Sequence, residues 1–328
     1  MELTLGITLA VLGAGFLHAG WNALLKSAPG GDALLDTATV VAGSGVWALA
    51  VVPFVPLPAA AAWPYMAASA TIHFGYYLTL AQAYRTGDLS FAYPLMRGTA
   101  PLIVALLGIA FLRELPTAPT AVGILLISLG IVSIAFVQSG ASPRREASAT
   151  VVRTRDVASS ALARVGESPL RPTRDTNSSE AIQGGRRKHS RAAAYWAFAN
   201  AAIIAAYTLV DARGARTSGN VASYVSWLLF LEGLPFLLWV LHRRGRVAVQ
   251  YIGSSAARGL IGGACSLAAY GIVLWAMTRA PVAAVAALRE TSVLFAALMG
   301  SLWLKEGFGL PRLAGAVSVV LGIAALKL

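Results

Sequence analysis

Charge is scarce in this sequence, and so is cysteine. Only 12% of the 328 residues are charged, whereas a soluble domain carries about 25%. The single cysteine, Cys265, excludes an intramolecular disulfide and a cysteine cluster for metal. Apolar and polar residues do not alternate as they do in the strands of a membrane barrel. With 57% hydrophobic residues and a mean hydropathy of +0.68, the chain is expected to be a polytopic helical membrane protein.

Catalytic motifs are missing as well. The sequence contains no HExxH, no aspartate-rich cluster and no Ser-His-Asp set at a spacing that would indicate a triad. His18 and His73 lie in different expected helices, without a partner that the sequence reveals. We therefore expect no enzyme, no cofactor and no metal site.

Long apolar stretches are what the sequence has instead. A transmembrane helix needs ~20 mostly apolar residues, and ten such stretches follow one another, separated by short connections rich in glycine and proline. We predict an all-α fold with ten transmembrane helices, located in the cytoplasmic membrane. The alanine- and arginine-rich composition is typical of a bacterial source. The predicted spans are 3–25, 33–57, 62–84, 89–112, 117–138, 192–211, 221–241, 255–277, 282–304 and 311–328.

Residues 139–191 interrupt this pattern. The segment has eleven Lys and Arg against five Asp and Glu, so it carries +6 of the chain's net +12. It cannot bury enough apolar surface to order itself, and no aromatic residues are interleaved for base stacking. We predict a flexible basic linker that does not bind nucleic acid, between repeats at 1–138 and 192–328.

The two halves repeat one another at a spacing of 192 positions. Random apolar helices would match at leucine and alanine, but this register also matches arginine, threonine, glycine and a basic-acidic pair. Five spans per half make the second half enter the membrane from the opposite side. Inverted repeats of this kind are common in secondary transporters, which bind substrate near the midplane. The matched positions include Arg97 and Arg289, Thr99 and Thr291, Gly123 and Gly315, Gly130 and Gly322, and Arg113-Glu114 and Lys305-Glu306.

Proline differs between the two copies of this repeat. Pro94 and Pro101 flank Arg97 in the span at 89–112, and proline removes a helical hydrogen bond and kinks the helix. The span at 282–304 has neither proline. We therefore expect the second copy to be the straighter helix.

Four charged residues lie deep inside predicted spans: Arg97, Arg289, Glu290 and Glu232. Each costs on the order of 2.5–3.5 kcal/mol at a helix centre, so they must be paired or face a water-filled cavity. One interpretation is a set of internal ion pairs, such as Arg289 with Glu232. The other is a substrate path, in which the arginines donate to an anionic group and Glu232 or Glu290 could carry a coupling proton.

Polar and aromatic residues at helical spacing support a cavity. Side chains at i, i+3 and i+4 share one helix face, and two spans show this spacing. Aromatic residues near span ends also form interfacial belts, which is the alternative for Trp21 and Tyr207. The residues assigned to the cavity are His18, Trp21, Asn22, His73, Tyr76, Tyr77, Tyr207 and Asp211.

Three motifs carry a resemblance to a known family. They are HAGWNALLK at 18–26, AAYTLVDARG at 205–214, and the segment from LRE to LKE at 288–306 with its earlier copy. With the two five-helix halves, they resemble EamA-like members of the drug/metabolite transporter superfamily. The resemblance implies a secondary carrier that moves a small metabolite, such as an amino acid or an organic anion, by alternating access, coupled to protons or to exchange. A helical scaffold or receptor without transport is the alternative.

Orientation and oligomeric state stay open at this point. Most basic residues, including the linker, lie on one side of the predicted topology, and the positive-inside rule places that side in the cytoplasm. The resembling family has both termini in the cytoplasm, which implies the opposite. The sequence does not indicate whether the chain forms oligomers.

Overall fold

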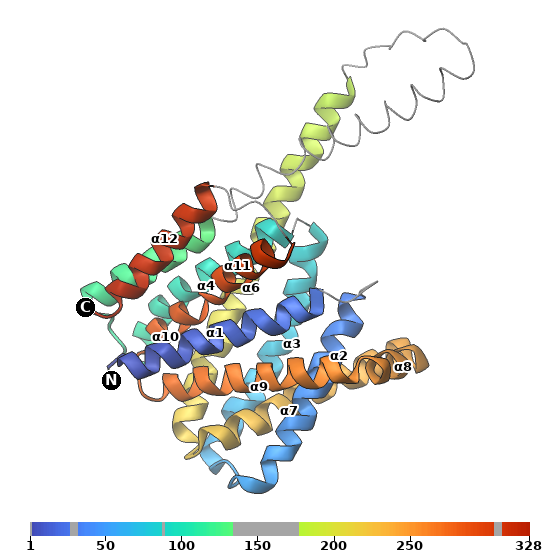
Figure 1. Cartoon of the computed structure of the whole chain (residues 1–328), viewed down its shortest axis with the longest axis vertical. Helices are drawn as coiled ribbons and strands as arrows, with labels where there is room; N and C mark the ends of the chain where they lie inside the picture. Colours follow the sequence, from blue (N-terminus) through green and yellow to red (C-terminus); the bar gives the residue numbers. More distant parts are fainter. Residues whose placement is uncertain (1, 27–31, 87–88, 134–176, 305–309) are drawn as a thin grey trace.

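The computed structural model describes residues 2–26, 32–86, 89–133, 177–304 and 310–328. Within these ranges the chain is helical and contains no strand, and the long helices pack into one bundle (Figure 1). In chain order the elements are α1 (Leu5–Lys26), α2 (Ala33–Val51), η1 (Val52–Phe54), η2 (Ala60–Ala62), α3 (Trp63–Thr86), α4 (Leu89–Phe111), a helix at Ala118–Ser133, α6 (Asn177–Thr217), α7 (Val221–Arg244), α8 (Arg246–Ser254), α9 (Ala256–Met277), α10 (Val282–Arg289), α11 (Ser292–Leu304) and α12 (Leu310–Ala325).

Seven segments in the described residues are long and apolar enough to cross a membrane. The chain is therefore a multi-pass membrane protein. The other three predicted spans are also helical, but α3 carries polar side chains such as His73 and Gln82, and the helices Ala118–Ser133 and Leu313–Ala325 are shorter. Part of the span at 117–138 lies outside the described residues. The seven candidates are Leu5–Leu24, Leu34–Phe54, Phe91–Phe111, Arg191–Thr217, Val221–Arg244, Ala256–Met277 and Val282–Met299.

The predicted straight span at 282–304 is in fact broken. α10 ends at Arg289 and α11 begins at Ser292, whereas α4 continues as one helix through both of its prolines. At the break the backbone bonds shorten to an i to i−3 pattern, and the Thr291 hydroxyl donates to the Leu288 carbonyl oxygen at 2.7 Å. The expectation from proline content was therefore wrong. A 3₁₀-like turn inside a helix often marks a functional position.

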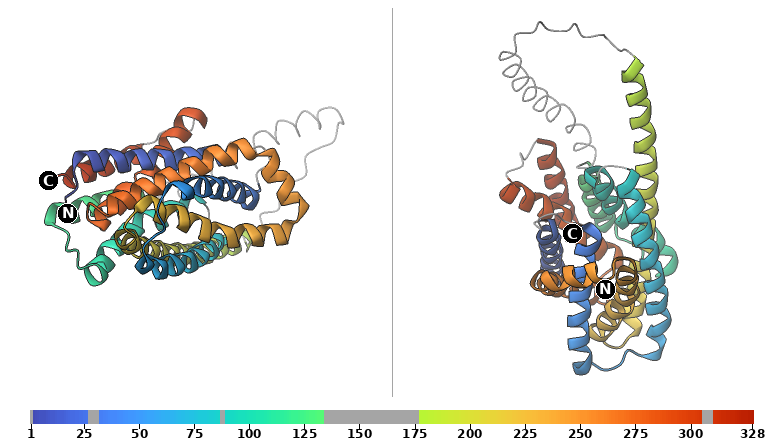
Figure 2. Two further views of the ribbon diagram at one scale, coloured as in Figure 1. Left: turned by 90° about the horizontal axis from the view of Figure 1, so that it is seen from below. Right: turned by 90° about the vertical axis from the view of Figure 1, so that its right-hand side faces the viewer.

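α10 lies in the centre of the bundle. Every residue from Val282 to Arg289 is buried, which is the pattern of a core helix that is apolar all round. The break between α10 and α11 packs closely against α1. A Cβ added to Gly15 of α1 would lie 3.2 Å from the Thr291 hydroxyl oxygen. The end of α10 therefore lies in the interior of the bundle, which Figure 2 shows from two further sides.

α2 and α9 approach one another through glycines. A Cβ at Gly263 would lie 2.3 Å from the backbone of Gly43, and a Cβ at Gly259 would lie 2.7 Å from the Thr39 carbonyl oxygen. Trp47 Nε1 also donates to the Leu260 carbonyl oxygen at 2.9 Å. Small residues let helix backbones approach closely in membranes.

A similar close approach joins α12 to the helix that follows α4. A Cβ at Gly123 would lie 2.8 Å from the Gly322 carbonyl oxygen. A Cβ at Gly130 would lie 2.7 Å from the Gly315 carbonyl oxygen. The two helices therefore cross at two glycine pairs.

Two helical segments were not predicted. α8 lies in what the sequence analysis treats as a connection, and it is anchored by Tyr251, whose hydroxyl donates to the Asp36 carboxylate at 2.6 Å. This hydrogen bond raises the pKa of the Tyr251 phenol above its ordinary value. α6 begins at Asn177, inside the predicted linker, and extends beyond its neighbours (Figure 1). The rest of that linker, 139–176, lies outside the described residues.

Candidate functional site

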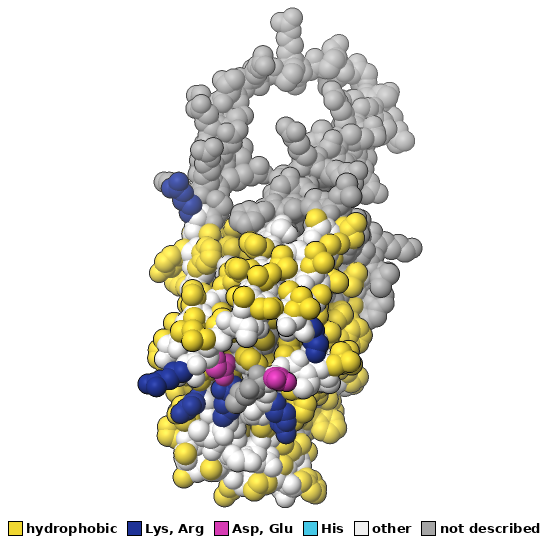
Figure 3. All heavy atoms as spheres, turned by 90° about the vertical axis from the view of Figure 1, so that its left-hand side faces the viewer, with side chains coloured by type: hydrophobic (Ala, Val, Ile, Leu, Met, Phe, Trp, Pro, Cys, Tyr) yellow, Lys and Arg dark blue, Asp and Glu magenta, His cyan; other side chains and the backbone are white. Residues whose placement is uncertain are grey.

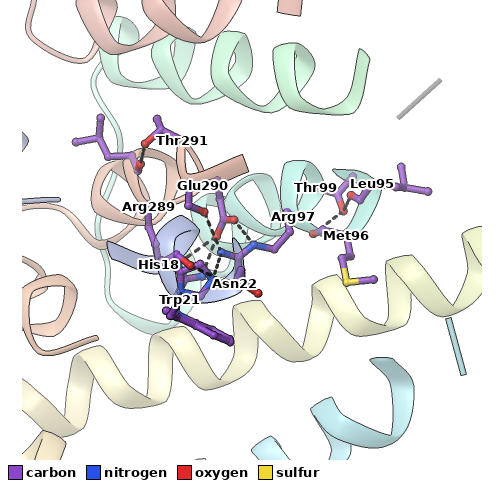
Figure 4. Close-up of polar contacts among 12 residues, drawn as sticks. His18, Trp21, Asn22, Leu95, Met96, Arg97, Thr99, Arg289, Glu290 and Thr291 are labelled. Atoms are coloured by element: carbon purple, nitrogen blue, oxygen red, sulfur yellow. Dashed lines mark hydrogen bonds and ion pairs between the residues drawn. The ribbon is translucent and has the colours of Figure 1, made fainter. Parts of the chain in front are cut away.

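Three charged side chains meet at the break between α10 and α11. Arg97 Nε of α4 lies 2.6 Å from Glu290 Oε2, as a close ion pair without hydrogen-bond alignment. Arg289 donates to the other oxygen, Glu290 Oε1, from Nη2 at 3.0 Å and from Nε at 3.1 Å. Figure 4 shows the carboxylate between the two guanidinium groups. All three side chains are buried, with exposed fractions of 7%, 8% and 0% for Arg97, Arg289 and Glu290.

Side chains of α1 and α11 complete this group. Arg97 Nη2 lies 3.4 Å from His18 Nε2 and 3.4 Å from the Ser292 hydroxyl. Trp21 Nε1 approaches the other ring nitrogen of His18 at 3.4 Å, and Asn22 donates to the His18 carbonyl oxygen at 2.7 Å. We call Arg97, Arg289, Glu290, His18 and Ser292 the arginine cluster.

The arginine cluster carries an excess of positive charge. Two guanidinium groups, which stay protonated in proteins, share one carboxylate, and His18 faces a donor at each ring nitrogen. A neutral imidazole can accept at one nitrogen only, so His18 adds no positive charge here. The three charged groups therefore sum to +1 inside an apolar bundle. A buried net charge is costly unless it is compensated, so the cluster suits an anionic group.

A second polar group lies between α3, α6 and α7. Glu232 Oε2 is 3.2 Å from His73 Nδ1, and each side chain is 10% exposed. Asp211 of α6 is fully buried and accepts hydrogen bonds from the hydroxyl groups of Tyr224, at 3.0 Å, and Tyr270. We call Glu232, His73, Asp211, Tyr224 and Tyr270 the histidine cluster.

Aromatic rings connect the two clusters. The Tyr207 ring stacks on His73 at 4.2 Å between ring centroids and meets the Tyr76 ring edge-on at 6.0 Å. The Tyr207 hydroxyl interacts electrostatically with Arg289 as well as with Asp211. Tyr77, in contrast, stacks on Phe236 at the outer side of this group. Tyr207 thus lies between the arginine cluster and the histidine cluster.

The structure brings together most of the predicted cavity residues, but not in the predicted pairs. The hypothetical pair of Arg289 with Glu232 does not form, because Arg289 bonds its neighbour Glu290 and Glu232 lies against His73. Adjacent residues on a helix do not face each other, so spacing does not predict a pair of Arg289 with Glu290. The break after Arg289 is what allows the two side chains to meet. The sequence analysis also missed Ser69, Tyr93, Tyr224, Tyr270 and Ser292, since single hydroxyl groups in apolar helices give no signal.

A further ion pair closes one end of the bundle. Glu114 Oε1 lies 2.7 Å from Arg216 Nη1, and Glu114 Oε2 accepts from the Val282 N–H at 2.8 Å. Arg216 also donates to the Met277 carbonyl oxygen at 2.7 Å and to Ala280 at 3.4 Å. These contacts tie the turn after α4 to the ends of α6 and α9. The sequence analysis uses Glu114 only as a marker of the repeat.

This end also holds both chain termini. Lys327 Nζ donates to the Leu3 carbonyl oxygen at 3.0 Å, and Figure 3 shows basic and acidic side chains gathered in one area of an otherwise apolar face. An open hollow of about 630 Å³ lies beside Arg216, between the α6–α7 and α9–α10 turns. It does not reach the arginine cluster, whose members line no part of it. The chemistry of the buried clusters therefore makes them the stronger candidate for a site.

Comparison with known proteins agrees with this architecture. Residues 191–328 match the model of the EamA-like transporter family. A solved structure, described only as the crystal structure of a protein, is 16% identical, spans 98% of both chains and has a TM-score of 0.67. At this identity the likeness concerns the fold alone, but it extends through the first half of the chain. No curated protein matches.

The matched segment contains four of the seven apolar segments that are long enough to cross a membrane. Within it, α6 supplies Asp211, α7 supplies Glu232, and α10 with the break after it supplies Arg289 and Glu290. Members of the matched family are membrane transporters of small molecules. Residues 191–328 therefore match the EamA-like transporter family, as the motifs at 205–214 and 288–306 predict.

Proposed function

We propose that this protein is a secondary carrier of the bacterial cytoplasmic membrane that moves a small metabolite with an anionic group. The observation that carries the proposal is the arginine cluster, where Arg97 and Arg289 share the single carboxylate of Glu290. Arginine binds carboxylates with two parallel hydrogen bonds, so either guanidinium can exchange part of its contact with Glu290 for a substrate carboxylate. A bound anion would also neutralise the excess positive charge. An amino acid or an organic acid fits this chemistry.

The proposed mechanism is alternating access between two inverted five-helix repeats. Helix packing supports this, because α1 packs on α9 as α6 packs on α3, and a shift of 192 positions converts one pair into the other. The Ser318 hydroxyl donates to the Leu126 carbonyl oxygen at 2.8 Å, and these two residues are one repeat spacing apart. A pseudo-two-fold axis that passes between them would also relate the two glycine pairs of this crossing.

The arginine cluster lies where such an axis would place a substrate site. Arg97 and Arg289 occupy equivalent positions of the repeat but have unequal surroundings. Arg289 is the last residue of α10, whereas Arg97 lies inside the continuous helix α4. The Glu114–Arg216 ion pair closes the end of the bundle that holds the termini. Substrate would enter from the opposite end in this state, and the ion pair would separate when access changes.

Ligand-dependent thermal stabilisation of the purified protein tests the proposal. A ligand that binds the native state stabilises it by RT ln(1 + [L]/Kd), so millimolar probes reveal weak substrates. The probes are L-glutamate, L-alanine, succinate, glucose and choline. We expect at least one carboxylate to raise the melting temperature of the wild type, and we expect Arg289→Gln to lose that shift.

Arg213→Gln is the matched control, because Arg213 is an exposed arginine on α6 outside both clusters. It should keep the full shift. Stabilisation by choline alone would contradict the assignment of an anionic substrate. A wild type that neither responds to a probe nor exchanges labelled succinate or glutamate in liposomes would contradict the carrier itself.

A further inference from the structure

We propose that the Glu232 carboxyl group is the proton-binding site of this carrier, and that it releases its proton to drive transport. This inference rests on the proposed function for the coupling, but the binding of the proton can be tested without any substrate. The site is separate from the arginine cluster and belongs to the histidine cluster.

The first observation is an unsatisfied carboxyl oxygen. Glu232 Oε2 is buried and has no hydrogen-bond partner among the described residues. Asp211 accepts from two tyrosines and Asp36 accepts from Tyr251. Glu290 Oε2 also has no aligned hydrogen bond, but it lies 2.6 Å from the Arg97 guanidinium, whereas Glu232 has no arginine or lysine partner among the described residues. A carboxylate that lacks a donor is expensive to bury in its charged form.

The second observation concerns the proton of His73. Nδ1 of this histidine lies 3.0 Å from the Ser69 carbonyl oxygen, which can only accept a hydrogen bond. The Ser69 hydroxyl lies 3.2 Å from the same nitrogen. The carbonyl contact is a hydrogen bond only when Nδ1 carries a proton, which then points to Ser69 within the same helix. Glu232 Oε2 lies 3.2 Å from Nδ1 but receives no hydrogen bond from it.

The surroundings of Glu232 add negative rather than positive charge. The groups that face or act on it are His73 and Tyr77 of α3, Asp211 of α6, Tyr224 of α7 and Tyr270 of α9. No arginine or lysine of the described residues is among them. Two carboxyl groups thus lie near a single histidine, and like charges in one buried site disfavour double ionisation. A proton bound to Glu232 removes one of the two negative charges.

A proton fits this site better than a metal cation. No group of three His, Cys, Asp or Glu side chains in the described ranges could hold a metal ion. Two of the Asp211 contacts are tyrosine O–H donors, which occupy the carboxylate oxygens that a cation would need. These contacts favour a proton over a metal cation at this site.

Tyr207 provides the physical link to the substrate site. It stacks on His73 and also interacts with Arg289, so an anion bound to the arginine cluster would act on the charge state of the histidine cluster across one ring. A negative substrate favours the neutral Glu232, and its release favours the carboxylate. Proton and anion would therefore move together.

Infrared difference spectroscopy of the full chain in lipid bilayers tests the proton site directly. The spectrum at acid pH minus that at alkaline pH should contain a carboxylic-acid C=O band that is lost in Glu232→Gln. Asp36→Asn is the matched control, because Asp36 is also buried but lies outside the cluster; this variant should keep the band. His73→Gln should keep the band and change the pH at which it titrates. A band that survives in Glu232→Gln, or that is lost in Asp211→Asn instead, overturns the assignment.

A transport assay separates this inference from the proposed function. In liposomes, Glu232→Gln should still exchange labelled succinate or L-glutamate across the membrane, but it should no longer accumulate either acid against its gradient when the outside is acidified. Uphill accumulation by this variant at the wild-type level overturns the coupling. If the wild type transports neither probe while the Glu232 band is present, the proposed function fails and the proton site stands.

Discussion

Replacing Glu290 by glutamine should destabilise the protein more than removing either arginine. Glu290→Gln keeps the size of the side chain but leaves Arg97 and Arg289 with a combined charge of +2 in the bundle interior. All three side chains are at most 8% exposed, so water cannot screen the repulsion. Removing one partner of a buried ion pair costs about 3–5 kcal/mol.

Arg97→Gln should cost less, because it leaves the neutral pair of Arg289 and Glu290. The loss is then of the order of a charge-assisted hydrogen bond, about 1.5–3 kcal/mol. The double variant Arg97→Gln/Glu290→Gln restores a charge of +1 and should be more stable than Glu290→Gln alone. The stability regained in the double variant measures the coupling free energy between Arg97 and Glu290, which is expected only for residues in contact.

The assay is reversible unfolding of the purified variants in mixed micelles, followed by tryptophan fluorescence, with size-exclusion profiles as a check of folding. We expect the wild type to be the most stable, followed by Arg97→Gln and then by the double variant. Glu290→Gln should be the least stable of the four proteins. A Glu290→Gln protein that is as stable as Arg97→Gln would refute the shared ion pair, whatever the absolute values.

Two further predictions concern the helix contacts that frame the clusters. Gly263→Ala should lower the free energy of unfolding by the cost of overpacking, about 1–3 kcal/mol or more, because its Cβ would lie 2.3 Å from the backbone of Gly43. Gly271→Ala, whose Cβ would meet nothing within 4 Å, should be neutral. Equal melting temperatures for the two variants would contradict the close approach of α2 and α9. Glu114→Gln should weaken the end of the bundle where the Glu114 carboxylate pairs with Arg216. The rate of amide hydrogen exchange in the turn after α4 should therefore rise severalfold. An unchanged exchange rate would show that this ion pair does not hold the end together.

The pairing of the buried charges could not be predicted from the sequence. Spacing identifies Arg97, Arg289, Glu290 and Glu232 as residues that need partners, because a charge in a long apolar helix has no other reason to be tolerated. Which of them meet depends on how far α4, α7 and α10 are rotated and displaced relative to one another. These quantities follow from side-chain packing between helices, and apolar composition carries almost no information about them.

The break after Arg289 is a second example. Proline is the strongest local signal for a disrupted helix, and it lies only in the first copy of the repeat. The second copy breaks without proline, because Thr291 and Ser292 find hydroxyl contacts with Leu288 and Arg97 that replace regular helical bonding. Such contacts exist only after the helices have packed.

By itself, the sequence determined that this protein is helical and spans a membrane several times, since long apolar segments must bury their backbone polar groups in helices. It also predicted the repeat, and its motifs predicted the match of residues 191–328 to the EamA-like transporter family. The tertiary structure alone decided that Glu290 serves two arginines, that Glu232 is left without a donor, and that Glu114 closes one end of the bundle. Each of these depends on the distance between residues far apart in the chain, which is set by the packing of whole helices and not by any local pattern.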